Sequence, residues 1–160
     1  MKYVIETGKD HHLPEVMGLI EDLAEFEKAP ESVTNTVDRM RSETDYFDFF
    51  VATVDGEVIG AAVYFFAYFT WVGKSLYLDD LYVRPEYRGN KVASALLARI
   101  FETARKHDCQ RVRWQVLDWN SNAIKLYEKL GARLDGEWLN CDFTETQIAD
   151  VADQLNYARF

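Results

Sequence analysis

Apolar residues recur with helical spacing near the start of the chain. Between residues 13 and 24 they fall at i, i+3, i+4 and i+7 positions, which places them on one face of a helix. We expect this helix to begin after Asp10, whose side chain can cap it, and to end before Pro30. A short strand is expected at Lys2–Thr7, and a second, shorter helix between Thr34 and Arg41. The predicted buried stripe consists of Leu13, Val16, Met17, Ile20, Leu23 and Ala24.

The patterning then changes from helical to strand-like. Phe49–Val54 and Glu57–Trp71 are rich in aromatic and β-branched residues, which is typical of strands. The dipeptide Asp55-Gly56 between them suits a tight hairpin, because both residue types tolerate positive φ. Lys74–Arg84 is predicted to be the third strand of this antiparallel meander, and Pro85 ends it.

Helical spacing returns in the second half of the chain. Gly89–His107 is predicted to be a long helix, followed by a strand at Arg111–Leu117. Ser121 can cap a further helix at Asn122–Leu130, and Gly131 can close it.

The C-terminal segment is expected to add a strand or two and a last helix. The strands are placed within Arg133–Phe143. Thr144-Glu145-Thr146-Gln147 fits a capping box at the start of the helix. The apolar stripe of this helix would be Ile148, Val151, Ala152 and Leu155.

This order of elements predicts an α/β (α+β) fold with a mixed sheet. An antiparallel meander is followed by a βαβ crossover with a parallel pair, and a helix ends the chain. No repeat, low-complexity tract or linker marks a boundary, so we expect one domain over residues 1–160.

Composition excludes several classes of function. The chain carries 18 Lys and Arg against 27 Asp and Glu, a net charge of −9, which argues against a general nucleic-acid binder or an anionic membrane surface as partner. The acidity is compatible with a cationic partner or with solubility alone. Cys109 and Cys141 form no CxxC pair or zinc spacing, which favours a cytoplasmic protein without a metal. The apolar run Gly60–Val72 is too short for a membrane helix.

The most informative stretch for chemistry runs from Leu81 to Ala93. A strand ends at Pro85 and a helix starts near Gly89, so unsatisfied N–H groups and the helix dipole could attract a phosphate there. Three cationic residues, Arg84, Arg88 and Lys91, stand nearby in an otherwise acidic chain. The alternative is an ordinary strand–helix turn with a surface arginine.

This stretch resembles the acetyl-CoA-binding motif of the GNAT superfamily of N-acetyltransferases, Gln/Arg-x-x-Gly-x-Gly/Ala. Arg88 matches its first position and Ala93 its last, whereas Lys91 replaces the middle glycine. A second stretch with the same resemblance runs from Leu117 to Ala132. The resemblance implies acetyl-CoA as cosubstrate, no metal, and a homodimer.

Three further segments resemble a narrower group, the diamine (spermidine/spermine) and thialysine N-acetyltransferases. They are Leu23–Glu27, Thr70–Lys74 and Tyr77–Asp80. Diamine acetyltransferases carry an Asp where this chain has Phe69. This departure moves the expected acceptor from long polyamines toward a smaller diamine or a lysine-like amino acid.

The resemblance implies two catalytic residues. Tyr127 matches the family tyrosine proposed as general acid near the CoA sulfur; by spacing alone it could equally be a core aromatic. Asp79 matches the carboxylate that binds the amine and helps remove its proton through water. Adjacent residues of a strand point to opposite faces, so only one of Asp79 and Asp80 is expected to face the site.

Binding residues follow from the same resemblance. Phe26, Glu27 and Trp71 would line the amine site, although Glu27 could be an exposed helix-end charge and Trp71 a hairpin packing residue. The expected acetyl-CoA contacts are Leu81, Tyr82, Val83, Arg88, Gly89, Asn90, Lys91, Val92, Ala93, Ser94, Asn120, Ala123 and Tyr127.

The sequence therefore predicts a small-amine N-acetyltransferase. Two alternatives stay open. One is an enzyme of the same fold that acetylates protein or peptide amines. The other is a CoA-binding module without turnover, which the glycine-to-lysine departure at Lys91 would favour.

Overall fold

The computed structural model describes residues 1–157, and the chain divides into two compact units, Met1–Leu117 and Asp118–Phe160. The first unit holds a five-stranded sheet in the order β1-β2-β3-β4-β5. Neighbouring strands are antiparallel except for β4 and β5, which are parallel. The strands are β1 (Val4–Thr7), β2 (Asp48–Val54), β3 (Glu57–Phe69), β4 (Gly73–Val83) and β5 (Arg111–Arg113).

The meander and the crossover expected from the sequence are confirmed. Asp55 and Gly56 connect β2 to β3 with φ angles of 50° and 87°, the positive values that a tight hairpin requires. The connection from β4 to its parallel neighbour β5 runs through the helix α3 (Val92–Lys106).

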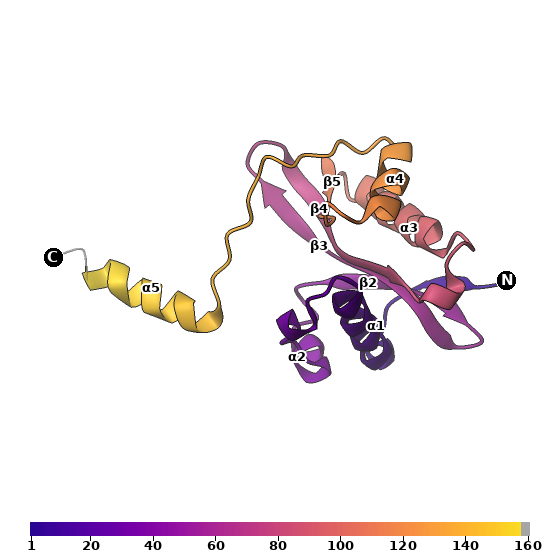
Figure 1. The fold of residues 1–160 in the computed structure, drawn as a ribbon, viewed down its shortest axis with the longest axis horizontal. Helices are drawn as coiled ribbons and strands as arrows, with labels where there is room; N and C mark the ends of the chain where they lie inside the picture. Colours follow the sequence, from indigo (N-terminus) through magenta and orange to yellow (C-terminus); the bar gives the residue numbers. More distant parts are fainter. Residues whose placement is uncertain (158–160) are drawn as a thin grey trace. The chain divides into compact units, whose positions relative to one another are not determined.

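Helices cover both faces of this sheet (Figure 1). The helices α1 (Leu13–Phe26) and α2 (Val37–Ser42) pack together on one face, and α3 packs on the other face against β2, β3 and β4. Leu13, Val16 and Met17 of the predicted stripe are buried, and Ile20 and Leu23 pack partly buried against the same core, which confirms the stripe; Leu19 is buried as well, although it was not predicted. Three short 3₁₀ turns, Asp10–His12, Pro30–Ser32 and Pro85–Tyr87, complete this unit.

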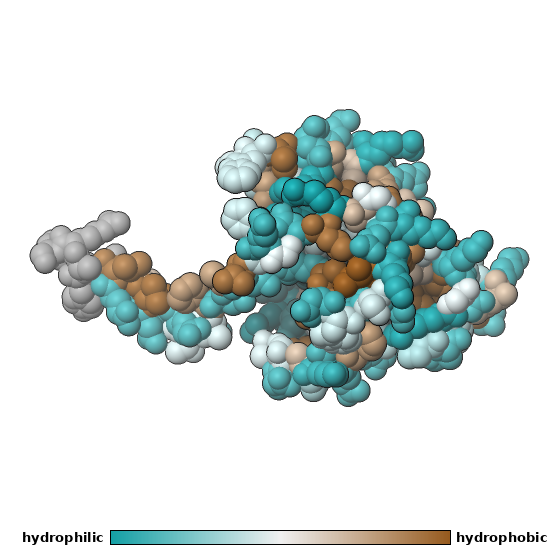
Figure 2. Space-filling view, turned by 45° about the horizontal axis from the view of Figure 1, so that its top comes forward, coloured by the Kyte–Doolittle hydropathy of each residue, from teal (hydrophilic) through white to brown (hydrophobic). Residues whose placement is uncertain are grey.

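The second unit contains α4 (Ser121–Lys129) and α5 (Glu145–Tyr157). Asn120 is the residue that caps α4, because its side chain accepts a hydrogen bond from the Ala123 N–H; the prediction of Ser121 as cap was wrong by one residue. The capping box of α5 is confirmed by reciprocal hydrogen bonds between Thr144 and Gln147. Figure 2 shows apolar side chains along one side of α5 and polar ones along the other.

Two strand predictions were wrong. The strand expected at Arg111–Leu117 is only three residues long, and residues 133–143 form no strand within the described chain. The ladder between β4 and β5 stops at Tyr77, just before a bulge in β4. Because a bulge bends its strand and increases its twist, a neighbouring strand loses its partner there. An alternating pattern does not make a strand without a backbone partner.

Candidate active site

A β-bulge in β4 brings two carboxylates to the same face of the sheet. Leu78 pairs with Tyr64 and Asp80 pairs with Val63, which leaves Asp79 as the extra residue. Val63 belongs to the core under α1, so Asp80 is on that face. Asp79 follows Leu78, whose side chain is on the α3 face, and therefore also points to the α1 face. The expectation that only one of the two faces the site was wrong, because the bulge interrupts the alternation.

The negative charge of Glu27 acts on the Asp80 carboxyl. Burial, together with the negative charges of Asp79 and Glu27, raises the pKa of the half-buried Asp80 carboxyl to about 7. Burial also raises the pKa of Asp79 and that of Glu27 above their ordinary values. Glu27 comes from the C-terminal end of α1, so the chain assembles three carboxylates from two elements. We call Glu27, Asp79 and Asp80 the carboxylate cluster.

The carboxylate cluster suits a cationic amine. Three nearby carboxyl groups cannot all ionise without repulsion, and a bound ammonium group relieves that repulsion. A carboxyl group with a pKa near neutrality is also matched to accepting a proton at pH 7. Among the described residues no group of three or more His, Cys, Asp and Glu side chains is arranged to hold a metal ion.

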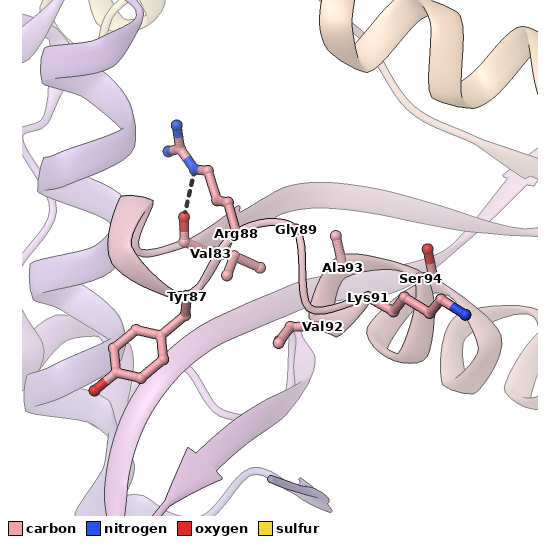
Figure 3. Close-up of a pocket in the computed structure, with 8 residues that line it drawn as sticks. All are labelled: Val83, Tyr87, Arg88, Gly89, Lys91, Val92, Ala93 and Ser94. Atoms are coloured by element: carbon pink, nitrogen blue, oxygen red, sulfur yellow. Dashed lines mark hydrogen bonds between the residues drawn. The ribbon is translucent and has the colours of Figure 1, made fainter. Parts of the chain in front are cut away.

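Arg88 ties the end of β4 to the end of α1. Its Nε donates a hydrogen bond to the Val83 carbonyl at 2.9 Å. The guanidinium carbon lies 5.6 Å from the centre of the Phe26 ring and 5.2 Å from that of Tyr82. Figure 3 shows this side chain directed toward Val83 and away from Lys91. Arg88 therefore positions Phe26, beside Glu27, against the end of β4.

A hollow of about 280 Å³ lies between the end of β4 and the start of α3 (Figure 3). The first N–H groups of α3, which have no intrahelical acceptor, open onto this loop. The Asn90 side-chain amide donates to the carbonyls of Tyr87 and Arg88, both at 3.2 Å, and so stiffens the loop. The lining residues are Val83, Tyr87, Arg88, Gly89, Lys91, Val92, Ala93 and Ser94.

The basic residues of this region have different partners. Arg84 donates to Glu57 Oε1 at 2.6 Å, so that its charge is already matched. Arg88 is held at Val83 as described. Lys91 lines the hollow itself and is exposed. The hollow with its helix N-terminus and Lys91 fits a phosphate group, whereas Arg84 does not contribute a free charge to it.

Lys91 adopts the backbone conformation that a glycine would adopt without strain. Its φ and ψ are 63° and 16°, in the left-handed region, and it is the N-cap of α3. The lysine bears a steric cost in this conformation that a glycine at the same position would avoid.

Of the remaining predicted residues, one belongs to the first unit and three to the second. Trp71 of the first unit lies in the turn between β3 and β4 with 87 % of its surface exposed. Asn120, Ala123 and Tyr127 are spaced by three and four residues at the start of α4, so they share one face of that helix.

Sequence reasoning missed two arginines of β5. The guanidinium carbons of Arg111 and Arg113 lie 4.2 and 5.7 Å from the centre of the Phe69 ring. An available signal was their spacing: two arginines at i and i+2 of a predicted strand lie on one face of it.

Comparison with known proteins identifies the class of protein. The acetyltransferase (GNAT) family matches residues 13–132, and the chain belongs to this family. A thialysine N-epsilon-acetyltransferase from Caenorhabditis elegans is 39 % identical over 128 residues, covering 79 % of this chain and 80 % of that protein. An L-ornithine N5-acetyltransferase from Arabidopsis thaliana is 33 % identical over 125 residues, covering 77 % of this chain and 54 % of that protein.

A solved structure agrees with this fold. The crystal structure of an aminoglycoside acetyltransferase from an uncultured soil metagenomic sample superimposes with a TM-score of 0.74 at 21 % identity, covering 90 % of this chain and all of that one. The family match and the thialysine N-epsilon-acetyltransferase relative, rather than this superposition, show that the protein is an N-acetyltransferase that acetylates an amine; its family uses acetyl-CoA. None of the helices in the described part of the chain combines the length and the apolar character that a membrane span requires.

Lys91→Gly is expected to stabilise the protein. Glycine adopts positive φ without the steric cost that a lysine bears, so the free energy of unfolding should rise by about 1 kcal/mol. Denaturant unfolding measures this change. The matched control is Lys125→Gly inside α4, which should lose about 1 kcal/mol. Equal losses in both variants would contradict the strain at Lys91.

Asp80→Asn is expected to change how stability depends on pH. The unfolded carboxyl ionises near 3.8 and the folded one at about 7, so ionisation costs the folded state stability as pH rises between these values. As the pH rises from about 4.5 to 8, the free energy of unfolding of the variant should increase relative to that of the wild type by on the order of 1–3 kcal/mol. Thermal or denaturant unfolding across this range measures the difference. The exposed Asp45→Asn should change nothing, and parallel pH curves for wild type and Asp80→Asn would refute the assignment.

Proposed function

We propose that this enzyme transfers the acetyl group of acetyl-CoA to the primary amine of a small diamine, polyamine or lysine-like amino acid. The observation that carries the proposal is the carboxylate cluster, which concentrates negative charge on one face of the sheet at the bulge of β4. A small ammonium compound is the chemical complement of such a cluster.

The proposed cosubstrate site uses the end of β4 and the loop that follows. Bound acetyl-CoA supplies a thioester-activated acetyl group. Backbone groups of Leu81, Tyr82 and Val83 would hold the pantetheine arm as an added strand next to β4, where β5 leaves the ladder. The residues from Arg88 to Ser94 would hold the pyrophosphate through the N–H groups at the start of α3, with Lys91 adding charge. In the second unit, Asn120 and Ala123 are the proposed contacts to the CoA arm.

In the proposed reaction the carboxylates first bind and then deprotonate the amine. An alkylammonium has a pKa near 10, so it must lose a proton before its nitrogen lone pair can attack. Asp79, the more exposed aspartate, would receive the ammonium together with Glu27. Asp80, with a pKa of about 7, is suited to share the released proton directly or through water. Phe26 and Trp71 would line the path of the amine and provide aromatic faces for its cation.

Tyr127 is the proposed acid for the leaving group, the sulfur of CoA. A phenol with an ordinary pKa near 10 keeps its proton at neutral pH, and a thiol with a pKa near 8.5 leaves as a thiolate that a phenol hydrogen bond stabilises. We assign to Tyr127 this donation from its Oη.

The proposal extends to setting and assembly. Cys109 and Cys141 are both unpaired thiols, as in a reducing cytoplasm. The amphipathic α5 offers an apolar stripe to a second copy, and we propose a homodimer. Light scattering with and without residues after 143 tests this assembly.

A thiol-release assay tests the reaction. With acetyl-CoA and a panel of putrescine, spermidine, lysine, thialysine, ornithine and a lysine peptide, release of CoA is expected with one or more of the small amines. Turnover with the peptide alone would favour a protein acetyltransferase. If acetyl-CoA binds but no amine causes release of CoA, the result would favour a CoA-binding module without turnover.

Tyr127→Phe is expected to lower kcat with little change in KM for acetyl-CoA. The substitution removes the phenolic hydroxyl group, whose proton acts in the transition state, and one such group contributes on the order of 10²-fold. Steady-state kinetics with the best amine of the panel measures the change. Asp79→Asn serves as comparison, because its effect should fall mainly on the amine. Unchanged turnover in Tyr127→Phe would remove Tyr127 from the mechanism.

A further inference from the structure

Two arginines and an aromatic ring form a cationic platform beyond the carboxylate cluster. Arg111 and Arg113 of β5 both lie over the ring of Phe69 at the end of β3, at 4.2 and 5.7 Å from guanidinium carbon to ring centre. A guanidinium stacked on an aromatic face is oriented by it and keeps its N–H edge available for an anion. We call Phe69, Arg111 and Arg113 the arginine platform.

The arginine platform has no anionic partner among the described residues. The ion pairs found there involve Arg41, Arg84, Arg99 and Arg133, and neither arginine of the platform. The Nε atom of Arg111 is buried and has no hydrogen-bond partner among the residues that the structure describes. A buried donor of a charged group without an acceptor is costly, and an incoming acceptor would remove that cost.

The arginine platform and the carboxylate cluster lie on the same face of the sheet. Arg113 pairs with Tyr77 across the parallel ladder, and Arg111 pairs with Ser75. Tyr77 precedes Asp79 by two residues, so their side chains point the same way. Burial raises the pKa of the Tyr77 hydroxyl, the charge of Asp79 raises it further, and the charge of Arg113 lowers it. Tyr77 therefore interacts with both the carboxylate cluster and the arginine platform.

The separation of the two features matches a short amino acid. Two residues along β4 and one strand spacing across give about 8 Å between the Cα positions of Asp79 and Arg113. An extended lysine-like molecule spans a comparable distance from its side-chain amine to its α-carboxylate. Tyr77 and Phe65, stacked with 5.1 Å between ring centres, lie between these ends and can contact the methylene chain.

We propose that Arg111 and Arg113 bind the α-carboxylate of an amino acid whose side-chain amine lies at the carboxylate cluster. This inference rests on the proposed function and narrows its acceptor from small amines in general to ω-amino acids. Arginine presents paired N–H groups that match the two oxygens of a carboxylate. The same charges repel the second ammonium group of a diamine, so the platform selects by repulsion as well as by attraction.

The test compares each amino acid with the diamine that lacks its carboxylate. The pairs are lysine with cadaverine and ornithine with putrescine, measured as kcat/KM in the thiol-release assay. Wild type should favour the amino acid of each pair. Arg113→Gln and Arg111→Gln should each lower kcat/KM for the amino acid by about 10- to 100-fold, the effect expected for one charge-assisted hydrogen-bonded contact. Their kcat/KM for the diamine should stay the same or rise.

A matched control and a converse variant make the result specific. Arg99 of α3 also lies over an aromatic ring, that of Phe50 at 5.0 Å, on the opposite face of the sheet, so Arg99→Gln should leave both members of each pair unchanged. Phe69→Asp places a carboxylate beside the two arginines and should erase the preference for the amino acid. Thermal melting of each variant verifies that it is folded.

The outcomes separate this inference from the proposed function. Acetylation of diamines with no preference for amino acids, or equal losses for both members of a pair in Arg113→Gln and Arg111→Gln, would overturn the carboxylate site and leave the small-amine function intact. No acetylation of any small amine would overturn both. A preference for amino acids that falls in the arginine variants and survives in Arg99→Gln supports both.

Discussion

The β-bulge at Asp79 is the constraint on which the candidate site depends. One extra residue in β4 turns two neighbouring aspartates to the same face, where burial and mutual repulsion raise the pKa of Asp80 to about 7. The same irregularity comes two residues after the end of the β4–β5 ladder. A single local departure from strand geometry therefore supplies acidic groups and leaves an edge of β4 open for an added strand.

The net charge of −9 is distributed unevenly across the functional region. Several cations of the first unit have structural roles: Arg84 pairs with Glu57, and Arg88 joins β4 to α1 through Val83 and Phe26. Lys91 is left at the hollow before α3, and the arginine platform is left on the other side of the carboxylate cluster. Because net charge sums over all of these residues, it does not show which site binds which ligand. The interaction partners of each charged side chain do show which charges are available to a ligand.

The sequence was sufficient for those features that depend on local patterning. The stripe of α1, the Asp55-Gly56 hairpin and the capping box at Thr144 follow from spacing and turn chemistry within a few residues, and the structure confirms them. The bulge at Asp79 could not be predicted, because it depends on the register between β3 and β4, which no single-strand pattern contains. The stacking of Arg111 on Phe69 joins residues more than forty positions apart, so the sequence alone did not reveal it.

The position of Phe69 links the fold to substrate choice. An aspartate at this place would pair with Arg111 or Arg113 and cancel their charge, whereas a phenylalanine stacks beneath them and leaves their N–H groups available. One face of the sheet then carries negative charge at the bulge and positive charge at its far end, with the Phe65 and Tyr77 rings between. Such an arrangement complements a molecule with an ammonium group at one end and a carboxylate at the other. A molecule with ammonium groups at both ends meets attraction at the first and repulsion at the second, so the polarity of the sheet face itself discriminates between amino acids and polyamines.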